Sequence, residues 1–187
     1  MTNCEQSREG EITIYLGLGS NVGDREANLG EAIGRIKTDL AEITRQSSIY
    51  ETEPVGFIDQ PWFLNQVVEA RLSTQRTADQ AILFLCKLLE IESEMGRQRK
   101  IVNGPRLIDI DLLLFDDLVV PSANDTPSSS EAPRIVLPHP RMHLRRFVLE
   151  PLCEIAPDFT HPILHKTCRE ILASLEDESI VMLFKKQ

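Results

Sequence analysis

The most constraining feature of the chain is an apolar run, residues 106–115, that two acidic side chains interrupt at Asp109 and Asp111. In a strand, successive side chains point to opposite faces, so residues 108, 110, 112 and 114 would form one apolar face and the two aspartates would share the other. Two strand steps separate the carboxylates by roughly 7 Å, a spacing that suits a pair of metal ions about 4 Å apart. Because aspartate is disfavoured in strands, packing gives no reason for the pair. We predict metal ligands. The alternative of carboxylates that are solvated or paired with arginines stays open.

The charge pattern indicates a small anionic ligand. The 187 residues carry a net charge of −9, which argues against nonspecific binding of nucleic acid over the whole surface. Positive charge gathers instead in two clusters, one formed by Arg97, Arg99, Lys100 and Arg106 and one by Arg141, Arg145 and Arg146. Local basic clusters beside a carboxylate pair favour a polyanion that is bound together with a divalent metal.

Nothing in the sequence indicates a membrane protein or a disulfide framework. No apolar stretch is long enough to span a bilayer, and the polar first residues do not resemble a signal peptide. The four cysteines are scattered and contain no Cys-x-x-Cys pair, so we expect reduced thiols. We therefore expect a cytoplasmic protein without membrane or nucleic-acid partners.

The order of predicted elements is β-α-β-β-α-β. Strands are predicted at 12–18, 43–51, 64–72 and 107–115, with one helix capped by Asp24 and a second by a Thr77/Gln80 capping box. Ile82, Leu85, Cys86 and Leu89 are expected on the inner face of the second helix. This order predicts an α+β, ferredoxin-like core with an antiparallel sheet, whose helices cover one face and leave the aspartates on the other, free face. C-terminal helical additions are expected near 145–154 and from Thr167.

Four local motifs resemble one enzyme family in order and spacing. They are Gly19-Ser-Asn-x-Gly-Asp24, Asp59-Gln-Pro-x-Phe-Leu-Asn65, Gly104-Pro-Arg-x-x-Asp-x-Asp111 and Leu137-Pro-His139. Together they are similar to the 6-hydroxymethyl-7,8-dihydropterin pyrophosphokinases of folate synthesis, over about residues 12–175. The resemblance implies transfer of pyrophosphate from ATP to the pterin, release of AMP, and two Mg²⁺ ions. We expect a single, monomeric domain over 12–175, with 1–11 and 176–187 as terminal extensions.

The resemblance also implies roles for individual residues. Asp109 and Asp111 would hold both Mg²⁺ ions and, with Arg97, Arg99 and Arg106, form the catalytic set, in which Arg97 and Arg99 close over the nucleotide. ATP would contact Glu92, Arg97, Arg106, Ile110, His139 and Arg145. The pterin would contact Thr52, Pro54, Val55, Phe63, Asn65 and Phe147. The chain departs from the family pattern at Val102, Asn103 and Pro140, all on the ATP side.

Three other functions match parts of this pattern less well. A Mg²⁺-dependent nucleotidyl transferase also places paired aspartates on a ferredoxin-like sheet, but it would release pyrophosphate. An RNA-recognition domain of this topology needs basic and aromatic residues on its central strands, where residues 107–115 offer aspartates. Dinucleotide binding is disfavoured because Gly17-x-Gly-x-x-x-Gly23 is one residue too long for the G-x-G-x-x-G pattern.

Overall fold

A six-stranded antiparallel sheet organises the protein. The computed structural model describes residues 10–96, 104–122 and 135–185. Its elements are β1 (Gly10–Ser20), α1 (Arg25–Asp39), β2 (Glu42–Gln46), β3 (Tyr50–Thr52), β4 (Phe63–Thr74), α2 (Ala78–Glu94), β5 (Asp109–Phe115), a 3₁₀ turn (Met142–Leu144), α3 (Arg146–Ile155), α4 (Cys168–Ala173) and β6 (Val181–Leu183). The strands follow the order β5-β1-β4-β3-β6, and β2 also pairs with β4. The predicted α+β, ferredoxin-like fold is confirmed.

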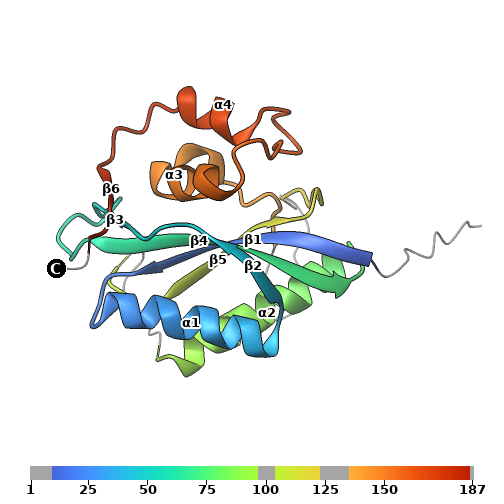
Figure 1. The fold of residues 1–187 in the computed structure, drawn as a ribbon, viewed down its shortest axis with the longest axis horizontal. Coiled ribbons are helices and arrows are strands. Elements are labelled where there is room, and N and C mark those ends of the chain that lie inside the picture. The colour runs from blue at the N-terminus through green and yellow to red at the C-terminus, as the bar shows by residue number, and fades with distance from the viewer. Residues whose placement is uncertain (1–9, 97–103, 123–134, 186–187) are drawn as a thin grey trace, which may run out of the picture.

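The layers are visible in Figure 1, where α1 and α2 lie on one side of the sheet and α3 and α4 on the other. The first helical pair packs on a core that includes Ile14, Leu16 and Val68. The second pair packs on a separate core that includes Tyr15, Val67 and Leu149. The face that we predicted to be free is therefore partly covered by the C-terminal helices. No helix in the described ranges is both long and apolar enough to cross a bilayer.

Local capping signals place both helices of the core correctly. Asp24 accepts a hydrogen bond from the Ala27 amide at the start of α1, and Thr77 accepts one from the Gln80 amide at the start of α2. The second half of the predicted capping box is absent, because the Gln80 side chain accepts from the Thr74 hydroxyl instead. Gly96, at a φ of +89°, ends α2 as predicted.

The predicted inner face of α2 is wrong. Its buried apolar residues are Ala81, Phe84, Leu88 and Ile91, whereas Ile82, Leu85, Cys86 and Leu89 are only partly buried. Both sets recur at helical spacing, so periodicity alone cannot choose between them. The tertiary fold decides: it turns Phe84 toward Phe115, with ring centroids 6.4 Å apart, and leaves Leu85 and Leu89 to line a cavity.

Strand β5 departs from the predicted alternation at its C-terminal end. Leu112 pairs with Leu16 and Leu114 pairs with Tyr15, so Leu113 is an extra residue and forms a bulge. Ile108, Ile110 and Leu112 lie in the core under α1 and α2, as predicted. Beyond the bulge the faces exchange: Leu114 joins the core under α3, and Phe115 takes the predicted place of Leu114.

The predicted strand 43–51 is divided into β2 and β3, which both pair with β4. Between them, Ser47 interrupts the strand and bonds to β4 through its side chain, since its hydroxyl accepts from the Val67 amide at 3.0 Å. The segment 176–187, predicted as an extension, contains β6, which pairs with β3 at the sheet edge.

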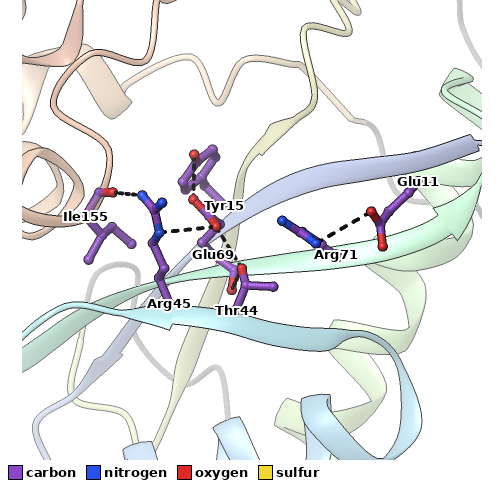
Figure 2. Close-up of polar contacts among 7 residues, drawn as sticks. All are labelled: Glu11, Tyr15, Thr44, Arg45, Glu69, Arg71 and Ile155. Atoms are coloured by element: carbon purple, nitrogen blue, oxygen red, sulfur yellow. Dashed lines mark hydrogen bonds and ion pairs between the residues drawn. The ribbon is translucent and has the colours of Figure 1, made fainter.

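A buried carboxylate joins the sheet to the C-terminal helices (Figure 2). Glu69, on β4, accepts hydrogen bonds from the hydroxyls of Tyr15 at 3.0 Å and Thr44 at 2.8 Å. Arg45 lies 3.8 Å from the same carboxylate and donates to the carbonyl of Ile155, the last residue of α3. Burial, with the Glu69 charge and hydrogen bond, raises the pKa of Tyr15, so its hydroxyl stays a donor at neutral pH.

Candidate functional site

Two glycines of the central strand form the floor of the candidate site. Gly19 of β1 lies directly opposite Asn65 of β4 and Asp109 of β5, and Gly17 lies opposite Val67 and Asp111. Directly paired residues share one face of a sheet, so the amide and the two carboxylates point to the same side. With strands about 4.8 Å apart, Asn65 and Asp109 stand on either side of Gly19 about 10 Å from each other. The two glycines add no side chains to this face, and both line a cavity.

A cavity of about 990 Å³ opens above this floor. Its lining includes the first turn of α3 and, on α2, Leu85, Leu89 and Glu92. Most predicted site residues in the described ranges line it: Thr52, Val55, Phe63, Asn65, Glu92, Arg106, Asp109, Ile110, Asp111, His139, Arg145 and Phe147. Pro54 is buried and does not line the cavity. Arg97 and Arg99 lie outside the described residues.

Arg106 lies between Asp109 and Phe63, and all three residues line the cavity. Its backbone amide donates to Asn21 Oδ1 at 2.8 Å, and its carbonyl accepts from the Asn21 amide at 3.2 Å, which anchors the segment that leads into β5. Its guanidinium bonds to Asp109 at 2.9 Å and lies 5.2 Å from the centre of the Phe63 ring. The buried Nε has no partner among the described residues and remains a donor for an anion.

His139 and Arg145 also line the cavity, near the two aspartates. Burial, together with Arg145 and Arg141, lowers the pKa of His139 to about 4, so the imidazole is neutral at pH 7. Its Nδ1 accepts a hydrogen bond from the Arg141 amide at 3.3 Å, which assigns the proton to Nε2 and makes that atom a donor. Burial and Arg141 also lower the pKa of Arg145, but Asp111 and Asp109 oppose this shift, and an arginine remains charged.

An amide and two aromatic rings define the third part of the site. Asn65, only 8% exposed, donates from Nδ2 to the Thr52 hydroxyl at 2.7 Å, which fixes the orientation of its amide. Phe63 is two residues earlier on the same face of β4 and is also buried. Phe147, in the first turn of α3, stacks with the Arg145 guanidinium at 5.3 Å. Such a set suits a flat heterocycle with donors and acceptors along one edge.

Glu92, which was predicted to contact ATP, also supports the backbone of β5. Its carboxylate is 2% exposed at the end of α2 and accepts from the Ile110 amide at 2.6 Å. Ile110 itself buries its side chain in the core, between the two aspartates along β5. Glu92 therefore holds the backbone that carries the carboxylate pair, and it also lines the cavity.

The sequence motifs did not identify two parts of the cavity: the floor formed by Gly17 and Gly19, and the apolar lining from Leu85 and Leu89. Gly17 was considered only for dinucleotide binding, and Leu85 and Leu89 were expected in the core. Only the register of β1 with its two neighbours reveals the floor, because it places Gly19 between Asn65 and Asp109 and Gly17 between Val67 and Asp111.

Comparison with known proteins places the chain among named relatives. The family model of 7,8-dihydro-6-hydroxymethylpterin-pyrophosphokinase matches residues 15–157. The 2-amino-4-hydroxy-6-hydroxymethyldihydropteridine pyrophosphokinase of Bacillus subtilis is 42% identical over 142 residues, which cover 75% of this chain and 76% of that protein. The Methylorubrum extorquens protein of the same name is also 42% identical, over 89% of this chain and 95% of its own length.

Longer proteins contain a similar region. The folic acid synthesis protein fol1 of Schizosaccharomyces pombe is 36% identical over 89% of this chain, which spans only 21% of that protein. A Plasmodium falciparum HPPK-DHPS crystal structure with pterin and p-hydroxybenzoate superposes with a TM-score of 0.67 at 16% identity, over 90% of this chain and 44% of that one. At this identity the superposition shows the fold alone.

Proposed function

This chain belongs to the 7,8-dihydro-6-hydroxymethylpterin-pyrophosphokinase family, and we propose that the cavity over β1, β4 and β5 is where it performs that chemistry. The reaction transfers the pyrophosphoryl group of ATP to 6-hydroxymethyl-7,8-dihydropterin and releases AMP, in folate biosynthesis. The observation that carries the proposal is the register that sets Asn65 and Asp109 on opposite sides of Gly19. One wall then recognises a heterocycle, and the other holds a charged triphosphate.

Mg²⁺ fits the carboxylate wall. Asp109 and Asp111 are partly exposed on one face of β5 and supply the oxygen ligands that Mg²⁺ prefers. Mg²⁺ is commonly bound through one or two carboxylates and takes its remaining ligands from substrate phosphates and water, so two aspartates are sufficient. We propose that both aspartates hold two ions, which when bound neutralise charge on the triphosphate.

The chain's own donors position the phosphates. Arg106 has a fixed backbone and an Nε without a partner among the described residues, so it can bind a phosphate while its Nη1 contacts Asp109. His139 offers a neutral Nε2–H donor, and Arg145 offers a charged one. We assign all three to ATP, with Glu92 and Ile110 shaping the adjoining wall. Arg97 and Arg99 remain proposed catalytic residues outside the described ranges.

The pterin occupies the glycine floor beside Asn65. With one Nδ2 hydrogen bonded to Thr52, the amide keeps Oδ1 and one hydrogen for the donor–acceptor edge of the pterin. Phe63 and Phe147 are placed to contact its faces, and Thr52 and Val55 line the same end of the cavity. This arrangement directs the hydroxymethyl group toward the carboxylate wall. Phosphoryl transfer depends mainly on such positioning and charge stabilisation.

Product analysis tests the proposal. Purified protein with ATP, Mg²⁺ and 6-hydroxymethyl-7,8-dihydropterin is expected to produce AMP and a pyrophosphorylated pterin in equal amounts by chromatography. A nucleotidyl transferase would release inorganic pyrophosphate, and an ordinary kinase would release ADP; either product, or no turnover, would contradict the proposed activity. The monomeric state and the cytoplasmic location stay predictions from the sequence.

A further inference from the structure

The start of α3 is capped by a residue far away in the sequence. Arg145 occupies the N-cap position, but its side chain makes no capping hydrogen bond. The Arg146 amide instead donates to Asp177 Oδ2 at 2.8 Å, and the second carboxylate oxygen accepts from the Ser179 amide at 2.9 Å. A carboxylate here satisfies one of the amides that a helix leaves without an internal partner, and it complements the helix dipole.

The same C-terminal segment continues onto the opposite wall of the cavity. Ile180 makes two hydrogen bonds with Glu53: its backbone amide donates to the side-chain oxygen Oε1 at 2.9 Å, and its carbonyl accepts from the Glu53 backbone amide at 3.3 Å. Strand β6 then pairs with β3, with Val181 opposite Thr52. Figure 1 shows this segment running from α4 across to β3. We call residues 177–183 the C-terminal strap.

The two attachments of the strap lie at two walls of the proposed pterin site. At one end, Asp177 bonds to the residue between Arg145 and Phe147, both of which line the cavity. At the other end, the strap contacts Thr52 and Glu53, which also line it, and Thr52 in turn orients the Asn65 amide. One short segment therefore connects the aromatic side of the pocket with its amide side.

We propose that the C-terminal strap is a positioning element of the pterin site, and that Asp177 is the positioning residue that sets Phe147 against the glycine floor. The inference rests on the proposed function, because it assigns the pterin to the space between these walls. Asp177 does not line the cavity, so it acts on the pterin site through the segments that it holds, the start of α3 and the strap itself.

The environment of Asp177 agrees with a fixed, ionised cap. Burial alone would raise its pKa, but the hydrogen bonds from the Arg146 and Ser179 amides outweigh this effect, and its pKa is lowered. The carboxylate is therefore charged at neutral pH, when it interacts most favourably with the first turn of α3.

Substitutions at position 177 test the proposal. D177A removes the cap, D177N keeps an oxygen that can accept from Arg146, and D177E keeps the charge but moves it by one methylene group. E178A is the matched control, because it removes an exposed carboxylate from the same segment. Binding of 6-hydroxymethylpterin is measured by calorimetry with a non-hydrolysable ATP analogue and Mg²⁺, well below the melting temperature of every variant. Hydrogen–deuterium exchange of the first turn of α3 is measured alongside.

D177A is expected to weaken pterin binding about fivefold, the factor that a typical helix N-cap contributes to an equilibrium. Its α3 first turn should exchange faster, whereas D177N and E178A should stay within about twofold of wild type in affinity. The pterin affinity of D177E should lie between that of D177A and that of wild type. If D177A does not fold, D177E is compared with wild type in its place. A general loss of stability would lower the melting temperature without changing the dissociation constant.

Pterin binding that is equal in D177A, D177E and E178A overturns the inference while the proposed function stands. Wild-type protein that does not bind the pterin at all overturns the proposed function, and the inference with it. The two failures are thus distinguished by the wild-type measurement alone.

Discussion

Replacing Gly19 by alanine tests whether the amide of Asn65 must occupy its observed position for the pterin to bind. A Cβ at Gly19 would lie 2.8 Å from Asn65 Oδ1, whereas a Cβ at Gly17 would meet its nearest atom, the end of the Leu113 side chain, at 3.4 Å. To reach the same separation, the amide must move by about 3.4 − 2.8 = 0.6 Å. The amide is not able to move without cost, because it is buried and bonded to Thr52 at 2.7 Å.

The expected consequence is weaker pterin binding with little change in ATP binding. A displaced amide loses one hydrogen bond to the pterin edge, which costs about 1–3 kcal/mol, so we expect the dissociation constant to rise roughly tenfold. Calorimetric titration with 6-hydroxymethylpterin measures this, and Gly30→Ala on α1 is the control, since its Cβ meets open space away from the cavity. If folded Gly19→Ala bound the pterin as wild type does, or if Gly30→Ala lost as much affinity, the assigned role of Asn65 would be refuted.

Three further outcomes are expected. Asp109→Asn and Asp111→Asn should each lower the rate of AMP formation more than about a thousandfold, while circular dichroism shows a retained fold; unfolding of both would indicate a structural role. Tyr15→Phe should cost about 1–2 kcal/mol in urea unfolding, because its hydroxyl serves the buried Glu69 carboxylate, whereas Tyr50→Phe, at the same 3.0 Å from an exposed carboxylate, should cost less than half as much; equal losses would contradict this. Burial lowers the pKa of His161 to about 4, below its unfolded value of about 6.5, so the unfolded state binds the extra proton between these pH values. The contribution of neutral His161 to the free energy of unfolding is complete above pH 6.5 and is lost on acidification, by up to about 1.4 kcal/mol per pH unit. If the free energy of unfolding of His161→Gln depended on pH as steeply as that of wild type, this assignment would be contradicted.

Local signals were sufficient for the order and type of most elements. Asp24, Thr77 and Thr167 each cap the helix that they were predicted to begin, because a cap depends only on residues within one turn. The alternating pattern of residues 108–112 likewise specified which side of β5 is buried, because strand geometry fixes the direction of successive side chains. The spacing of the aspartates, together with the motifs around them, was enough to indicate the family.

Other features depended on contacts between distant parts of the chain. Packing and strand register bring together residues that are far apart in the sequence. They decide which face of α2 is buried, where β5 bulges at Leu113, and why β2 and β3 are separate strands. The cover that α3 and α4 provide over the second sheet face has the same origin. Short-range patterns were consistent with more than one solution in each case, and the total apolar burial selected one.

The sequence by itself determined the chemistry that the chain carries: a carboxylate pair on one strand face, arginines near it, and an amide and aromatic rings elsewhere. Only the tertiary structure decided how these groups meet. Strand pairing places Asn65 and Asp109 on either side of Gly19, and the strap that ends at β6 joins the two walls of the pocket. The physical reason is that side-chain direction is a local property of the backbone, whereas distance across a sheet is set by hydrogen-bond register between segments that the sequence separates.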